Sequence, residues 1–163
     1  MADFFGKYRG TIVNAVDPED RGRIEVVVQD GPSTDSVWAM PCFPSGMFMI
    51  PDEYSAVWVE FERGDPSFPV WSGCFYPLGD PLPAAADAAA NPGVPVIAMH
   101  TPRGHSITIS DATGSDGGIT IKSANGTQVV VNDSGIQIKN ELGAKIELNG
   151  PIVSINNDAL KVV

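Results

Sequence analysis

The sequence has 163 residues, of which 43% are hydrophobic and 18% are charged, and its formal net charge is −10. This composition excludes a disordered chain, and no apolar run approaches the roughly 20 residues of a membrane-spanning helix. The negative charge argues against a nucleic-acid partner, because such proteins neutralise phosphates with clustered lysine and arginine. The first residues lack the basic flank and long apolar run of a secretory signal, so we expect no signal peptide and folding in the cytoplasm.

The first part of the chain predicts five β-strands, because runs of β-branched and aromatic residues alternate with turn residues. In the fourth of these runs, Val57, Val59 and Phe61 share one face and predict a core, while Trp58, Glu60 and Glu62 share the other. Five short strands with one longer connection are typical of a small closed barrel of the OB type. The expected strand ranges are 7–16, 22–30, 36–42, 56–63 and 69–75.

The connection between the third and fourth strands, residues 41–54, is unusually apolar. Such a loop needs a neighbour to cover it, and in a trimer that neighbour is another subunit. The apolar residues of this loop are Phe43, Met47, Phe48, Met49 and Ile50.

A change of composition at residues 77–95 predicts a linker. The segment has five prolines and no aromatic residue, whereas every aromatic residue and both cysteines lie before it. We therefore expect an OB-fold domain over 1–76, a Pro/Ala-rich linker over 77–95, and a second domain over 96–163. The acidity belongs mostly to the first part: residues up to Pro83 hold 5 basic and 13 acidic side chains, and those after it hold 5 and 7.

The second domain predicts short alternating strands at 106–109, 119–122, 128–131, 136–139, 145–148 and 152–155. Glycines at 118, 126, 135, 143 and 150 recur at spacings of 8, 9, 8 and 7, which is a loose repeat of one strand and one turn. A sheet of this kind has an apolar Ile and Val face, and the chain offers no helix or second layer to cover it.

The missing cover is therefore expected from other copies of the chain, three of which would wind about a common axis as an intertwined β-prism. The expected fold class is therefore all-β: a five-stranded barrel, a linker and a trimeric β-prism. We predict that the core between subunits contains Ile107, Ile109, Ile119, Ile121, Val129, Val131, Ile136, Ile138, Ile146 and Leu148.

Several groups of side chains are candidates for a metal, binding or catalytic site, but a structural role is favoured for each. His100 and His105, near Asp111, lack the further ligands of a zinc site, so we expect no metal. Aromatic residues on an OB barrel can stack on single-stranded nucleic acid or sugar. In so acidic a domain, core and subunit-contact roles are favoured for Trp38, Trp58, Trp71, Phe43 and Phe75.

The carboxylates and hydroxyls likewise favour a chain without an active site. No cleft is implied around Asp52, Glu60, Glu62 and Asp65, so a solvated rim is favoured over a catalytic pair. Neither Ser36 nor Ser106 lies in a nucleophile elbow, and there is no glycine-rich phosphate loop. Cys42 and Cys74 are expected to be reduced core residues. We therefore expect no enzyme activity and no cofactor.

Particular stretches of the chain resemble the phage baseplate assembly protein V family and the spike portion of the related VgrG proteins of type VI secretion. The matching stretches are Phe5–Val13, Asp17-Pro18, Arg21–Ile24, Trp38–Cys42, Val57–Pro66, Pro69–Gly73 and Arg103–Ile107. The resemblance implies an OB-fold collar followed by a triple-stranded β-helix, assembled as a homotrimeric central spike at the end of a tail tube. It also implies penetration of a target cell envelope by mechanical force.

The chain differs from larger relatives in ways that limit this comparison. It has no room for a lysozyme domain, and no histidine follows His105 to form the iron-binding tip of some short relatives. The expected location is the baseplate of a virion assembled in the host cytoplasm, with tail tube, hub and baseplate proteins contacting the collar and the membrane only as a pierced target. A separate tip-capping protein is expected to bind the apolar end at Ala159, Leu160, Val162 and Val163.

A second class of function stays open, in which the chain is a trimeric binding module. In this alternative the OB domain recognises a glycan or a protein, and the repeat domain serves only as a stalk. Adhesive modules usually carry long polar loops, whereas the long loop of this chain is apolar.

Overall fold

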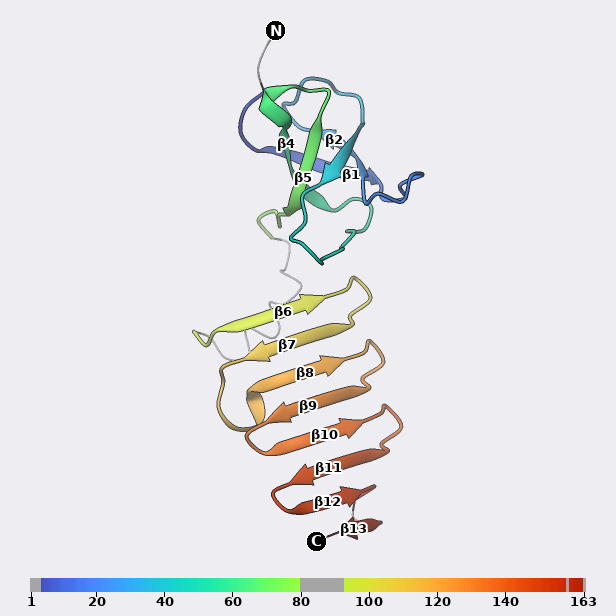
Figure 1. Ribbon diagram of the computed structural model, residues 1–163, viewed down its shortest axis with the longest axis vertical. Coiled ribbons are helices and arrows are strands. Elements are labelled where there is room, and N and C mark those ends of the chain that lie inside the picture. Colours follow the sequence, from blue (N-terminus) through green and yellow to red (C-terminus); the bar gives the residue numbers. More distant parts are fainter. Residues whose placement is uncertain (1–3, 80–92, 158, 163) are drawn as a thin grey trace. The chain divides into compact units, whose positions relative to one another are not determined.

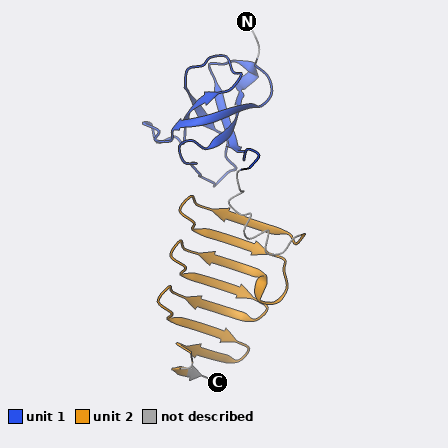
Figure 2. Cartoon of the chain, turned by 180° about the vertical axis from the view of Figure 1, so that it is seen from behind, with its two compact units in different colours: residues 1–80 blue, residues 81–163 orange. Residues whose placement is uncertain are grey.

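The computed structural model describes residues 4–79, 93–157 and 159–162, and the chain divides into two compact units, residues 1–80 and 81–163 (Figures 1 and 2). Most of the predicted linker, residues 80–92, lies outside the described residues. The described part contains no helix with the length and hydrophobicity needed to span a bilayer.

The first unit is a closed five-stranded barrel, as the sequence predicted. Its strands are β1 (Tyr8–Asn14), β2 (Ile24–Val28), β3 (Val37–Pro41), β4 (Ala56–Phe61) and β5 (Pro69–Cys74). They follow the order β1-β2-β3-β5-β4, and β4 pairs with β1 to close the barrel. Every pair is antiparallel except β3 with β5, which is parallel.

The barrel interior is filled by alternate residues of all five strands. The predicted inward face of β4 is confirmed, because Val57 and Val59 are fully buried and Phe61 nearly so. Trp71 is also fully buried, and its indole Nε1 donates a hydrogen bond to the Gly22 carbonyl oxygen at 3.3 Å. Glu62, predicted on the outer face of this strand, lies instead in the short 3-10 turn η1 (Glu62–Gly64) that ends it.

The two cysteines do not share one environment. Both are free thiols, but Cys42 is exposed, so the prediction that it is a core residue is wrong. It follows the last residue of β3, where the chain turns out into the long apolar loop. Cys74 is half-buried, and this burial raises the pKa of its thiol.

The second unit is a single antiparallel meander of eight strands, in which each strand pairs with its neighbours in sequence (Figure 1). The six predicted strands are present, and the sequence interpretation missed the first and the last. The strands are β6 (Val96–His100), β7 (Ser106–Ser110), β8 (Gly118–Lys122), β9 (Gln128–Asn132), β10 (Gly135–Lys139), β11 (Lys145–Asn149), β12 (Ile152–Ile155) and β13 (Leu160–Val162).

Two of the repeating glycines explain why the meander is so regular. Gly118 and Gly135 begin β8 and β10 with φ of +88° and +133°, conformations that side chains rarely adopt. A Cβ atom at Gly135 would overlap the carbonyl oxygen of Leu148 on β11, and one at Gly118 would overlap that of Val131 on β9. At these positions only glycine lets the neighbouring strand approach closely enough to pair.

Candidate functional site

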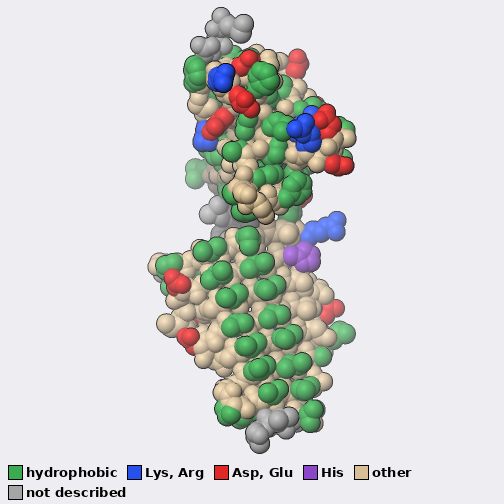
Figure 3. All heavy atoms as spheres, viewed as in Figure 1, with side chains coloured by type: hydrophobic (Ala, Val, Ile, Leu, Met, Phe, Trp, Pro, Cys, Tyr) green, Lys and Arg blue, Asp and Glu red, His purple; other side chains and the backbone are tan. Residues whose placement is uncertain are grey.

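The most prominent feature of the second unit is an apolar face that nothing in the described chain covers. Figure 3 shows hydrophobic side chains gathered over the whole length of this sheet. The most exposed of them is Ile97 at 66%, and Ile136 in the middle of the sheet is still 37% exposed. For residues of this type in a sheet of eight strands, such exposure marks a contact surface.

The register of the sheet arranges this face as two columns. Because residues opposite each other on adjacent strands point to the same side, each of the strands β6 to β12 adds one apolar side chain to each column, and β13 adds Leu160 to the second. The first column contains Ile97, Ile109, Ile119, Val131, Ile136, Leu148 and Val153. The second column contains Met99, Ile107, Ile121, Val129, Ile138, Ile146, Ile155 and Leu160. We call these two columns the apolar face.

All ten residues predicted for the core between subunits lie on the apolar face. Their burial between subunits stays a prediction, because the structure contains one chain. The face also includes Ile97, Met99, Val153 and Ile155, which were not predicted, and Leu160, which was predicted for the tip instead. The same alternation identifies them, but in β6 it begins directly after Pro95, where the sequence still has the composition of the linker.

The backbone of the inner strands has no free pairing capacity. Strands β7 to β12 each have an antiparallel partner of the same chain on both sides. A second chain can therefore contact this part of the sheet through side chains and turns, and backbone pairing remains open only at the outer strands β6 and β13.

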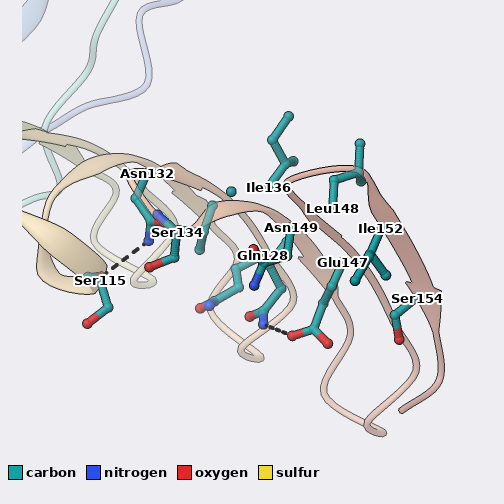
Figure 4. A pocket seen from close by; sticks show the side chains of 13 residues that line it. Ser115, Gln128, Asn132, Ser134, Ile136, Glu147, Leu148, Asn149, Ile152 and Ser154 are labelled. Atoms are coloured by element: carbon teal, nitrogen blue, oxygen red, sulfur yellow. Dashed lines mark hydrogen bonds between the residues drawn. The ribbon is translucent and has the colours of Figure 1, made fainter. Parts of the chain in front are cut away.

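The opposite face of the sheet is largely polar and contains an open hollow across β9 to β12, which the apolar Val130 and Ile152 also line (Figure 4). Inside it, the Gln137 side-chain amide donates to Glu147 Oε1 at 2.8 Å, and Lys145 Nζ lies 2.7 Å from Glu147 Oε2. The Asn132 amide donates to the Ser115 carbonyl oxygen at 3.3 Å. The one carboxylate among the residues lining the hollow is thus paired, and the arrangement fits a solvated outer surface better than a reactive site.

The sequence-predicted tip residues lie at the far end of the meander. Ala159 and Leu160 are exposed, and Leu160 begins the outer strand β13, which also contains Val162. Val163 lies outside the described residues. Their binding to a separate protein stays a prediction.

The apolar loop after β3 is partly anchored in the barrel. The Phe43 ring packs edge-on against Trp71 at 4.9 Å between ring centroids and against Phe48 at 6.0 Å. Phe48 is nevertheless 73% exposed, and Met47 and Met49 are about half exposed. Cover by a neighbouring subunit is consistent with this exposure and stays a prediction.

The candidate metal-binding, stacking and catalytic side chains do not form one cluster. Among the described residues no three histidine, cysteine or acidic side chains are grouped as a metal site would require. His105 Nδ1 accepts a hydrogen bond from the Ala124 backbone at 3.3 Å, which ties one turn of the sheet to the next. In the barrel, Glu60 forms an ion pair with Lys7, and Trp58 packs on Phe75 rather than standing free.

Comparison with known proteins yields two family matches that follow the two units. Residues 8–76 match the family described as the type VI secretion system/phage-baseplate injector OB domain. Residues 96–161 match the family described as the phage baseplate V C-terminal trimerisation domain. No curated protein matches the chain.

Proposed function

Because the chain belongs to the phage baseplate V family, with an N-terminal OB domain and a C-terminal trimerisation domain, we propose that it is the structural central spike of a contractile tail. In this role a homotrimer connects the tail tube to the tip and pierces the envelope of the target cell. The role is mechanical and non-enzymatic.

The exposed apolar face is the main observation that supports this proposal. Fully burying one exposed Val, Leu, Ile or Met side chain stabilises a structure by about 1.5–3 kcal/mol. Most residues of the apolar face are 37–66% exposed in the single chain, so each would gain part of this value on burial. Three sheets packed with their apolar faces about one axis would bury 15 such residues from each chain. The resulting core would be comparable with that of an ordinary domain, so the sheet gains its stability by trimerising.

The same packing supplies the stiffness that a spike needs. Successive strands are joined by backbone hydrogen bonds along the direction in which they stack, and a shared apolar core would hold the three ladders together. Removing one chain would uncover the whole apolar face at once, so we expect slow unfolding. We further propose that the three chains wind about one another along the common axis.

The barrel and the free strand edge fit the expected partners. We propose that the OB domain is the collar that contacts the tail tube or hub and the surrounding baseplate proteins. At the other end of the chain, β13 pairs with β12 alone and leaves one edge unpaired. Together with the exposed Ala159 beside it, this edge supports binding of a separate tip-capping protein.

The position of the chain in an assembled particle tests the proposal. Contractile particles from the organism that encodes the chain can be imaged by electron cryo-microscopy, with the chain located by an antibody against the OB domain. We expect three copies on the tail axis at the distal end of the tube. A peripheral position, or a copy number that is not three on the axis, would remove the central spike role.

A further inference from the structure

The two edges of the trimerisation sheet carry opposite charges. One edge, on the right in Figure 1, contains the turns 101–105, 123–127 and 140–144 and the adjoining strand ends. Its basic residues are Arg103, Lys122, Lys139 and Lys145. The other edge contains the turns 111–117 and 133–134, with acidic residues Asp111, Asp116 and Asp133 and no lysine or arginine.

The charges at the two edges are largely available to another chain. Lys145 pairs with Glu147, but Arg103, Lys122 and Lys139 form no ion pair within the part of the chain that the structure describes. Asp111, Asp116 and Asp133 are exposed. Within the described residues their carboxylates accept neutral hydrogen bonds, Asp133 from the Gly114 backbone at 3.0 Å and Asp116 from the Ser115 hydroxyl at 3.3 Å. Among the described residues of the basic edge, Glu141 is an acidic exception.

A ring of three sheets brings unlike edges together. In a trimer with a threefold axis along the stacking direction, every contact between neighbours is heterologous, so the right edge of one sheet meets the left edge of the next. This inference rests on the proposed trimer. We propose that the basic edge of each subunit docks against the acidic edge of the next copy of the same chain.

The function of this pairing would be to fix the direction of each subunit. A subunit turned upside down about the radial direction keeps its apolar face inward but exchanges its two edges. The apolar face alone therefore discriminates poorly between up and down. The reversed subunit would place basic edge against basic edge and acidic against acidic, and such like-charge contacts oppose assembly. A spike needs all three subunits to point the same way.

Charge reversal at two positions of each edge tests the pairing in the full-length chain. The first variant carries Arg103→Glu and Lys122→Glu, the second carries Asp111→Lys and Asp116→Lys, and the third combines all four. Asp133 is left unchanged because it caps a turn. Sedimentation equilibrium at low and at 0.5 M NaCl gives the concentration at which each trimer is half dissociated.

Each two-site variant is expected to dissociate at a concentration about tenfold higher than the wild type at low salt, because several exposed ion pairs are replaced by repulsions. The difference should shrink at 0.5 M NaCl, where the Debye length is only a few ångströms. The four-site variant again has two edges of opposite charge, so its half-dissociation concentration should return to within a few-fold of the wild-type value. Its subunits should not exchange with those of the wild type.

Two results would overturn the pairing. One is a four-site variant that is no tighter than either two-site variant, and the other is a set of variants that all trimerise like the wild type at both salt concentrations. Should a reversed variant fail to fold, Arg103→Gln with Lys122→Gln removes the attraction without repulsion, and an unchanged trimer would then contradict the proposal. A wild-type chain that stays monomeric would instead remove the proposed function itself.

Discussion

The Asp17 carboxylate lies 2.7 Å from the Arg23 guanidinium, across the turn that joins β1 to β2. The same carboxylate accepts hydrogen bonds from the backbone of Glu19, Arg21 and Arg23 at 2.8–3.1 Å. The Arg23 guanidinium also lies 5.4 Å from the centre of the Trp38 ring. One acidic side chain thus organises the whole turn, and the arginine side chain bonded to it holds the pKa of Asp17 well below its usual range.

Replacing Asp17 with asparagine should destabilise the barrel in a pH-dependent way. The pKa of Asp17 is depressed by folding, so its contribution is fully present above the unfolded pKa of about 3.9 and is lost as pH falls towards the lower folded value. The difference between wild type and Asp17→Asn should therefore be large at pH 7 and shrink below about pH 4. Urea unfolding followed by tryptophan fluorescence measures it, because all three tryptophans lie in the barrel.

The exposed Asp30 provides the matched control. It also has a positive φ, which asparagine tolerates, so Asp30→Asn should change stability by less than about 0.5 kcal/mol at either pH. Equal effects of the two substitutions would mean that the Asp17 hydrogen bonds contribute little.

Trp71→Phe should weaken the barrel more than Trp58→Phe does. Trp71 is fully buried and donates to the Gly22 carbonyl, so its loss leaves a smaller side chain and an unpaired acceptor, at a cost of about 1–3 kcal/mol. Trp58 is half-buried against Phe75, and the same change there should cost less than about 1 kcal/mol. Chemical unfolding followed by far-ultraviolet circular dichroism compares the two, and the opposite order would contradict the assigned core.

Two glycine substitutions should separate strain from steric overlap in the trimerisation domain. Gly143→Ala meets open space and should cost about 1–3 kcal/mol for its positive φ alone. Gly135→Ala adds the overlap with the Leu148 carbonyl and should disrupt the pairing of β10 with β11. Thermal melting of the two variants should show the larger loss for Gly135→Ala, and equal melting temperatures would rule out the close strand approach described above.

Charge on the apolar face should prevent assembly, whereas charge on the opposite face of the same strand should not. Ile121→Lys would place an ammonium group in the shared core, where burial without a partner costs several kcal/mol. Thr120 is the adjacent residue of β8 and points to the polar face, so Thr120→Lys is the matched control. Light scattering should give a monomer for the first variant and a trimer for the second. Trimers of both would place the interface elsewhere.

The sequence was most informative where local pattern and tertiary structure agree. Strict alternation predicted the inward Val57, Val59 and Phe61 and ten of the residues on the apolar face, because a two-residue period leaves only two possible faces. The repeat of glycines predicted the turns, since Gly118 and Gly135 occupy backbone conformations that few other residues adopt.

The missed features depend on contacts between distant residues or on context. The parallel pairing of β3 with β5 joins two strands over a sequence separation that no local pattern reveals. Strand β6 was missed because it directly follows the proline-rich linker segment, and only its pairing with β7 identifies it as a strand. Cys42 was expected in the core because free cysteines are usually buried, but it follows β3 at the start of an exposed loop. The opposite charges of the sheet edges become visible only once the meander places residues from separate turns along one edge.

The proposed spike depends on a trimer that is held together through the second unit of the chain. Light scattering on a sizing column should give a mass of three times 17.2 kDa for the full chain and a monomer or a weak oligomer for a chain ending near Pro83. Thermal unfolding of the full-length trimer should also depend on protein concentration. A monomeric full-length chain with concentration-independent melting would contradict the account, because the apolar face would then lie open to water.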